Sequence, residues 1–291
     1  MENTFLKRIT DIKMTKVQLQ IADYILKNQK RVLGMTAKDI GIELDVSDAS
    51  VIRFARAMGY EGLLEMKESL REELKENSEK IGKHSLHDRF VMQTEKYTKK
   101  VNSEDEILRL MEVNLETSIR ENDEEDYEEI ANHILQSDRK IVIGLRGGKG
   151  SALKFSRLLG HLTSRVERII DEGHDSICKL RELDEKDVVI ILNFSRYYRI
   201  DEKLAQIIKR QKSKIYLITD SLSSPIAKYA DKVLLAETEH CGFFHSMIGV
   251  EAILEYLLIL MCWKDPSAFR ERLKERDSIL CEYQLENPER T

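Results

Sequence analysis

The chain has 291 residues, with 47 Lys and Arg against 52 Asp and Glu and a formal net charge of -5. At roughly 100 to 200 residues per domain, this length predicts two domains. The 3 Pro and 13 Gly are too few for a collagen-like or low-complexity chain or for a turn-dense β-sandwich. Net acidity argues against a protein that coats nucleic acid, but it is compatible with a small DNA-reading module.

The N-terminal sequence MENTFLKRITDIKM has no positively charged leader ahead of an apolar stretch, so we expect no signal peptide. The most apolar segment, Val250 to Trp263, contains Glu251 and Glu255 and is shorter than the roughly 20 apolar residues that span a bilayer. We therefore expect a cytoplasmic protein that has no membrane partner. The 4 Cys form no C-x-x-C pair, and neither a metal nor a cofactor is expected.

Helical spacing of apolar residues from Thr15 to Lys75 predicts an N-terminal domain made of helices. Thr36 with Asp39 three positions later is a variant of the capping box, and it predicts a helix directly after Thr36. Ser47 predicts the N-cap of the next helix, DASVIRFARAM, which should close at Gly59 in the left-handed conformation. The pattern therefore predicts two short helices joined by a tight turn.

The second of these helices has the two faces that a DNA-reading helix needs, one apolar and one polar and cationic. The apolar face consists of Val51, Ile52, Ala55 and Met58. The candidate DNA-binding residues are Lys38, Ser47, Asp48, Ser50, Arg53 and Arg56, with Lys67 as a further candidate for the DNA backbone. Arg53 could contact a guanine edge or a phosphate. An ordinary amphipathic hairpin whose polar residues face water explains the spacing equally well.

The chain becomes highly charged between Glu61 and roughly Glu106, which indicates an exposed helix followed by a linker. We predict a helix-turn-helix domain at residues 1–78, a linker at 79–106, an effector-binding domain at 107–265 and a C-terminal helical tail at 266–291.

Five short apolar runs alternate with helical stretches in the second domain. They are KIVIGL, RVERIID, DVVIILNFS, KIYLITD and KVLLAE. Because each run is nearly continuous in Ile, Val and Leu, these strands should be buried on both faces. The sequence therefore predicts an all-α domain followed by an α/β domain with a five-stranded parallel sheet. In such sheets ligands bind beyond the carboxyl ends of the strands.

The first loop at that edge is glycine-rich and precedes a helix. Its candidate effector-binding residues are Arg146, Gly147, Gly148, Lys149, Gly150 and Ser151. Glycines let consecutive N–H groups point at an anion, and the helix dipole with Ser151 as a capping hydroxyl would add to this cradle. The loop matches neither G-x-x-x-x-G-K-[ST] nor G-x-G-x-x-G. A glycine-rich turn required only for steric reasons is the alternative.

Two more polar loops follow the third and fourth predicted strands. The loop NFSRYYR contains Ser195, Arg196 and Tyr197, a set of groups suited to a phosphate or a carboxylate. Alternatively, Arg196 and Arg199 could pair with the nearby acids Asp201 and Glu202. The loop TDSLSSP supplies Thr219 and Ser221. Because the three loops converge at one sheet edge, we expect a small anionic effector there.

The sequence resembles the RpiR/MurR type of bacterial transcriptional regulator over nearly its whole length. The resemblance rests on IADYI, AKDI, SDASVIRFARAMGYEG and MK, followed by a glycine loop, a serine loop and TDSLSSPIAKYAD. It implies an N-terminal helix-turn-helix that binds double-stranded operator DNA. It also implies a flavodoxin-like C-terminal SIS (sugar isomerase) domain that senses an effector, often a phosphosugar. By this resemblance, Ser47 to Met58 is the recognition helix, and Ser151 and Ser195 belong to the effector pocket.

The serine loop departs from the S-x-S-G-x-T pattern of sugar-phosphate SIS domains, since Arg196, Tyr197 and Tyr198 follow Ser195. The effector could therefore be a phosphosugar, a carboxylate or another anion. The segment FFHS, at residues 243–246, could line the same pocket. His245 could act there as a general base, although a packed or hydrogen-bonded side chain is the more common role of such a histidine.

The last strongly apolar helix, from about Ile248 to Cys262, is hydrophobic on most of its circumference and needs cover beyond the sheet. A second subunit would supply it, giving a homodimer or a dimer of dimers that places two recognition helices on a symmetric site. The C-terminal segment Pro266 to Thr291 is the alternative cover. We predict an effector-controlled, non-enzymatic DNA-binding regulator. The competing class is an aldose-ketose isomerase with His245 and Glu251 as proton-transfer groups.

Overall fold

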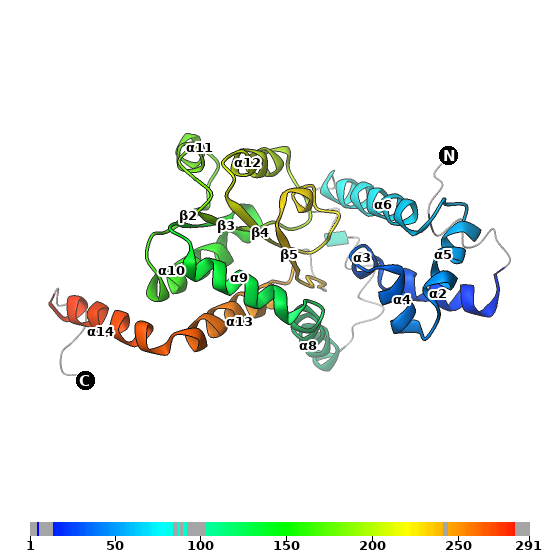
Figure 1. Cartoon of the computed structure of the whole chain (residues 1–291), viewed down its shortest axis with the longest axis horizontal. Coiled ribbons are helices and arrows are strands. Elements are labelled where there is room, and N and C mark those ends of the chain that lie inside the picture. Colours follow the sequence, from blue (N-terminus) through cyan, green and yellow to red (C-terminus); the bar gives the residue numbers. More distant parts are fainter. Residues whose placement is uncertain are drawn as a thin grey trace. The chain divides into compact units, whose positions relative to one another are not determined.

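The computed structural model describes Phe5, residues 14–83, His87, residues 90–91, residues 103–240 and residues 244–282 (Figure 1). The chain divides into two compact units, the first made of Met1–His87 and Ser221–Ser224, the second of Asp88–Asp220 and Pro225–Thr291. A helical region precedes an α/β domain, so the predicted fold class is confirmed. Helices extend into both ends of the predicted linker, because α6 ends at Lys83 and α8 begins at Glu104.

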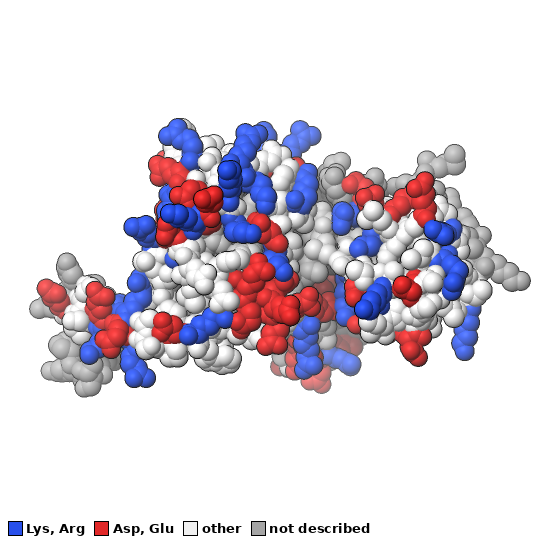
Figure 2. Space-filling model, in the orientation of Figure 1, with Lys and Arg blue, Asp and Glu red and all other residues white. Residues whose placement is uncertain are grey.

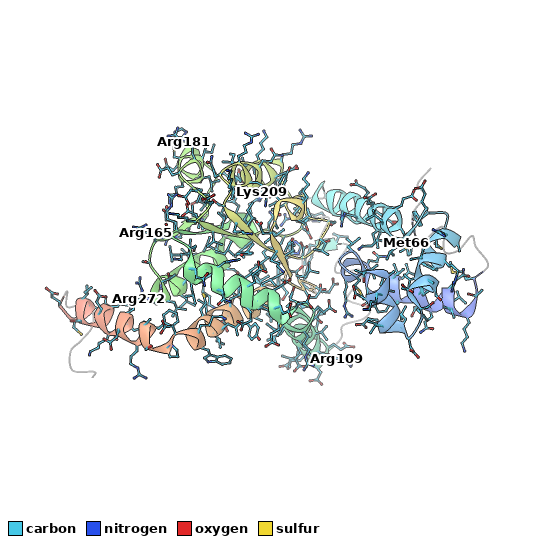
Figure 3. All side chains as sticks on the ribbon, in the orientation of Figure 1. Met66, Arg109, Arg165, Arg181, Lys209 and Arg272 are labelled. Carbon is cyan, nitrogen blue, oxygen red and sulfur yellow. The ribbon has the colours of Figure 1, made fainter. Side chains whose placement is uncertain are left out.

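The first unit is built from α2 (Lys16–Lys27), α3 (Gln29–Val32), α4 (Ala37–Leu44), α5 (Asp48–Ala57) and α6 (Leu63–Lys83). Its core is made of fully buried apolar side chains from successive helices, among them Ile21, Ile25, Ile40, Phe54, Met66 and Leu70. Met66 on α6 is one of the side chains labelled in Figure 3. Burial of such side chains contributes about 1.5–3 kcal/mol each before the entropy of ordering is subtracted.

The tight turn between α4 and α5 follows the predicted local signals. The Thr36 hydroxyl accepts from the Asp39 backbone N–H at 3.2 Å, and Asp39 accepts from the Thr36 backbone N–H at 2.7 Å, which completes the capping box. Asp45 adopts the left-handed conformation with φ 52°. A Cβ atom on Gly41 would lie 2.6 Å from the Val46 carbonyl oxygen, so this close approach requires glycine. Gly59 follows α5 with φ 83°, as predicted.

The second unit contains a five-stranded sheet in the order β2-β1-β3-β4-β5, with every neighbouring pair parallel. The strands are β1 (Lys140–Gly144), β2 (Val166–Ile169), β3 (Val188–Leu192), β4 (Lys214–Thr219) and β5 (Lys232–Leu235). All five lie within the predicted apolar runs. Every residue of β1 and β3 is buried, as expected for central strands covered on both faces.

Helices cover both faces of the sheet (Figure 1). The helices are α8 (Glu104–Arg120), α9 (Glu124–Gln136), α10 (Lys149–Leu162), α11 (His174–Arg181), α12 (Arg199–Arg210), α13 (Ile248–Lys264) and α14 (Pro266–Glu282). One core combines the sheet with α9, α10 and α13, and the other combines it with α11 and α12. The chain leaves β1 towards β2 through α10 and leaves β3 towards β4 through α12. Strands β1 and β3 therefore flank the topological switch point, where such sheets bind ligands.

Within the described residues, the apolar helix α13 has both buried and exposed apolar side chains. Val250, Ile253 and Leu257 are fully buried, and α14 contacts both α10 and α13. However, Ile259 is 44% and Trp263 71% exposed. In the part of the chain that the structure describes, no helix is both long enough and apolar enough to cross a bilayer.

Candidate functional site

The exposed face of α5 carries a row of hydrogen-bonded polar side chains. The hydroxyl groups of Ser47 and Ser50 lie 2.9 Å apart, and the Arg53 guanidinium donates to the Ser50 hydroxyl at 2.9 Å. Ser47 also caps the helix by accepting from the Ser50 backbone N–H. The opposite face is buried through Val51, Phe54, Ala55 and Met58. The helix therefore presents a fixed cation near its N-terminus.

The other predicted DNA-binding residues differ in how exposed they are and in whether their side chains are already hydrogen-bonded. Lys38, Asp48 and Arg56 are exposed, and Arg56 donates to the Glu61 carbonyl at 3.2 Å. Lys67 is less available, because its ammonium group donates to the Met35 carbonyl at 2.9 Å. Burial lowers the pKa of Lys67, and the nearby charge of Arg71 adds to the effect.

The acidic charge of the chain is unevenly distributed. Figure 2 shows Asp and Glu side chains gathered over α9, and Lys and Arg side chains along α11 and α12. The sequence of α9 starts with the acidic run EEDYEE. The net charge of the whole chain therefore says little about the local potential at α5.

The glycine loop forms a 3₁₀ turn, Arg146–Gly148, and α10 begins at Lys149 with Gly148 as its N-cap. Ser151 is buried in the first turn, and the expected capping role of its hydroxyl is wrong, because the N-cap is glycine. A Cβ atom on Gly148 would lie 2.8 Å from the Leu192 carbonyl oxygen, whereas Gly147 and Gly150 have nothing within 4 Å. Gly148 is therefore required for steric reasons, whereas Gly147 and Gly150 have open space where a side chain would be.

The two cations of the glycine loop are already paired with carboxylates of the same unit. Arg146 binds Glu172 and the carboxylate of Asp201, and its guanidinium lies 4.2 Å from the centre of the Tyr198 ring. Lys149 pairs with Asp171 at 2.5 Å. Asp201 is buried and also accepts from the Asn193 side-chain amide at 2.9 Å. This network ties the loops after β1 and β3 together.

The serine loop is organised around a second buried carboxylate, Asp220, at the end of β4. The backbone N–H of Ser195 donates to the two oxygens of Asp220 at 3.1 and 3.2 Å, and the Ser195 hydroxyl also contacts this carboxylate. The Tyr197 hydroxyl donates to Asp220 Oδ1 at 2.8 Å. Burial and the charge of Asp220 raise the pKa of Tyr197 well above its ordinary value, so its hydroxyl keeps its proton.

Arg196 lies between Ser195 and Tyr197 in the sequence, and among the described residues no hydrogen-bond partner of its Nε is found. Its backbone is left-handed, with φ 76°. Its Nε is buried without a hydrogen-bond partner, and no ion pair to it is found among the described residues. For Arg196 and Arg199, the expected alternative of pairing with Asp201 or Glu202 is not found among the described residues; there Asp201 pairs with Arg146 and Glu202 pairs with Lys228 at 2.6 Å.

The remaining predicted residues have separate surroundings. Thr219 is fully buried at the end of β4, and the Ser221 hydroxyl lies 2.8 Å from that of Ser223. The His245 ring lies edge-on to that of His240 with centres 5.7 Å apart. Glu251 pairs with Lys154 at 2.8 Å. Phe243 falls outside the described residues.

A small pocket opens at the carboxyl ends of β1 and β3, at the switch point. It is lined by Ile143, Leu145, Ile191, Leu192, Asn193, Asp201, Leu204 and Ile226. The polar groups of this pocket are Asn193 and the buried acid Asp201, which belongs to the network with Arg146. Sequence reasoning missed Asp201 and Asp220 as organising groups. The one available signal was the position of Asp220 at the end of a predicted apolar run.

Comparison with protein families gives one match for each unit. Residues 6–77 match the helix-turn-helix domain of the rpiR family, and residues 133–260 match the SIS domain. A transcriptional regulator of the helix-turn-helix type from Haemophilus influenzae is 25% identical over 85% of this chain and 84% of its own length. The regulator RpiR from Escherichia coli K12 is 20% identical over 76% of this chain and 71% of its own length.

Solved structures agree with this division. The sugar isomerase domain of an RpiR transcription factor from Sphaerobacter thermophilus matches 60% of this chain and 97% of its own, with a TM-score of 0.57 and 25% identity. The Vibrio vulnificus NanR protein, complexed with ManNAc-6P, matches 97% of this chain and 99% of its own, with a TM-score of 0.52 and 17% identity. The second similarity shows that the two-domain fold is shared.

Proposed function

Because this chain joins an rpiR-family helix-turn-helix domain to a SIS domain and so belongs to the RpiR type of transcriptional regulator, we propose that α5 reads operator DNA and that a small anionic metabolite bound by the SIS domain modulates this binding. A coupling of about 1–3 kcal/mol between the two sites would change operator affinity by roughly 5- to 150-fold.

The observation that carries the DNA-reading role is the row Ser47, Ser50 and Arg53 on the exposed face of a capped helix. A guanidinium held near the N-terminus of a recognition helix can form two hydrogen bonds with one guanine. Lys38 and Arg56 are exposed cations that would contact phosphates, and Asp48 in the first turn would help to select against wrong bases.

The effector would bind where the loops after β1, β3 and β4 converge. Arg196 would supply the cation, since Arg146 and Lys149 are paired. Gly147, Gly150 and Ser151 would form the floor of this site. The other candidate contacts are Ser195, Tyr197, Thr219 and His245. NanR, which has the same fold, is complexed with ManNAc-6P in its structure, so a phosphosugar is one candidate class and a carboxylate is the other.

We further propose a homodimer, or a dimer of dimers, that acts in the cytoplasm. The exposed Ile259 and Trp263 on α13 leave apolar surface for a second subunit. The effector would be bound without turnover. Glu251, one of the two candidate proton-transfer groups of an isomerase, is held in an ion pair with Lys154, and the named relatives are regulators.

The DNA-reading role can be tested by selecting duplexes from a random pool with the full chain and then measuring their binding by fluorescence anisotropy. We expect Arg53→Ala to weaken binding to the selected duplex by about 1–3 kcal/mol and to relax the preference at one base pair. Arg181→Ala removes the same charge from an exposed site on α11 and should leave binding unchanged. If the wild type bound selected and scrambled duplexes equally at moderate salt, the proposal would be wrong.

A further inference from the structure

We propose that the effector is a carboxylic acid bearing hydroxyl groups, whose carboxylate binds Arg196 while its hydroxyl groups donate to the Ser195–Tyr197 loop, and that Asp220 excludes phosphate from this loop. The inference rests on the proposed effector site, because it names the class of ligand that the site would take.

The donors of the serine loop are already used within the protein. A hydroxyl group has one proton to donate and lone pairs to accept with. The protons of Ser195 and Tyr197 are directed at Asp220, as is the Ser195 backbone N–H. The side chains of Thr219 and Ser195 also hydrogen-bond to the Tyr197 hydroxyl, so what the loop has left to offer a ligand is accepting lone pairs, chiefly those of Ser195, and no free proton. These lone pairs suit hydroxyl donors, whereas the oxygens of a phosphate need donors themselves.

Asp220 adds a negative charge directly beside the Ser195 and Tyr197 hydroxyl groups that a ligand of this loop would contact. It is buried, and no cation pairs with it among the described residues; its partners are neutral N–H and O–H groups. A phosphate would bring about -1.5 to -2 charges beside this carboxylate. At a separation of about 4 Å, two unit charges of like sign repel by about 4 kcal/mol under an effective dielectric constant of 20. A singly charged carboxylate would be repelled less than a phosphate at the same place, so Asp220 selects against phosphate.

Arg196 is suited to the smaller anion. Its guanidinium has no ion-pair partner among the described residues, and its Nε is buried without a hydrogen bond. A planar guanidinium can donate two parallel hydrogen bonds to a carboxylate and so satisfy both of its oxygens. The neighbouring cation Arg199 is exposed to solvent. One carboxylate on the outer nitrogens of Arg196 would supply the missing counter-charge.

The test compares matched pairs of ligands on the full chain. Each pair consists of a sugar acid and the corresponding sugar phosphate, such as gluconate and glucose 6-phosphate, and binding is measured by thermal shift and calorimetry. We expect at least one acid to bind the wild type about tenfold or more tightly than its phosphate partner, because bonds to charged groups contribute about 1.5–3 kcal/mol. Arg196→Ala should abolish that binding, and Arg181→Ala should keep it.

Asp220→Asn tests the exclusion directly. The side-chain oxygen of an asparagine accepts hydrogen bonds, but its nitrogen donates them. The substitution therefore frees the proton of the Ser195 or the Tyr197 hydroxyl for a ligand, and it removes the negative charge. We expect inorganic phosphate and sugar phosphates to bind this variant about tenfold or more tightly than the wild type. The proposal is overturned if a phosphate member binds the wild type better than its acid. It is also overturned if no acid binds the wild type and Asp220→Asn gains no phosphate affinity.

Tyr197→Phe provides a second variant in case Asp220→Asn does not fold. It removes one accepting hydroxyl but leaves the carboxylate of Asp220 in place. We expect it to weaken the bound sugar acid several-fold and to gain no affinity for phosphate; a gain would contradict the role given to Asp220. None of these measurements uses DNA. A failure of operator binding would therefore be seen separately from a failure of the ligand assignment.

Discussion

Two nearby glycines, Gly148 and Gly150, differ in the space that surrounds them. A Cβ atom on Gly148 would lie 2.8 Å from the Leu192 carbonyl oxygen and 3.2 Å from the Leu192 Cβ, whereas Gly150 in the first turn of α10 has nothing within 4 Å. Neither of the two has a positive φ angle. Their different requirements therefore come from packing and not from backbone conformation.

We predict opposite effects of alanine at these positions on the free energy of unfolding. Gly148→Ala should destabilise the SIS domain by about 1–3 kcal/mol, because the added methyl group forces the end of β3 to shift. Gly150→Ala should stabilise it by about 0.4–1 kcal/mol, because alanine lowers the entropy of the unfolded chain and favours the helix. Urea unfolding of both variants measures this. Equal effects of the two substitutions would contradict the assignment of Gly148 to a close contact.

At the scale of the elements, local sequence signals predicted most of the fold. All five strands were predicted from their short apolar runs. The central strands β1 and β3 are almost wholly apolar because they are buried on both faces, whereas the edge strand β2 is partly exposed and contains Glu167 and Arg168. The starts of α4 and α5 were predicted from Thr36 with Asp39 and from Ser47, since capping acts over three residues. Phe54 was missed as a member of the buried face of α5.

The organisation of the candidate site could not be predicted in the same way. Asp201 binds Arg146 across 55 positions of the sequence, and Asp220 binds Ser195 across 25 positions. Such partners depend on how adjacent strands bring their loops together, which no local pattern records. The sequence thus indicated the three loops but not which of their charges are already neutralised.

Asp231 joins β4 to β5 and makes the stability of the sheet dependent on pH. Its carboxylate accepts from the Ile215 backbone N–H at 2.9 Å and pairs with Lys209 at 3.3 Å and Lys214 at 3.4 Å. Lys209 on α12 is labelled in Figure 3. Burial opposes ionisation of Asp231, but the hydrogen bonds and the two lysines outweigh it and lower its pKa below 3.8.

A carboxylate whose pKa is lowered by folding stabilises the folded state at pH values above its ordinary pKa. This contribution is lost as the pH falls through the pKa of the folded state. We therefore predict that Asp231→Asn costs about 1–2 kcal/mol at pH 7 and that its unfolding free energy depends less on pH below about 4. Urea unfolding between pH 2.5 and 7 compares the variant with the wild type. If the two curves stayed parallel over that range, Asp231 would not be the titrating group.

At the scale of the whole molecule, the exposed apolar residues of α13 bear on the proposed homodimer. We predict that Trp263→Glu shifts the full chain towards the monomer in sedimentation experiments and weakens binding to a two-fold symmetric duplex, because a charge would be buried in the subunit interface. Ile177→Glu on α11, where Ile177 is 45% exposed, is the matched control and should leave both measurements unchanged. A wild type that sediments as a monomer at all concentrations would exclude the dimer.

The contact between Gly148 and the carbonyl of Leu192 has a mechanical consequence. The start of α10 and the last residue of β3 pack so closely that no methyl group would fit between them. Helix α10 is a rod of 14 residues, about 21 Å long at 1.5 Å per residue, and it rests against α14. Displacement of the loop after Leu192 by an incoming metabolite would tilt this rod. The disturbance would reach the C-terminal helix, where amide hydrogen exchange could register it.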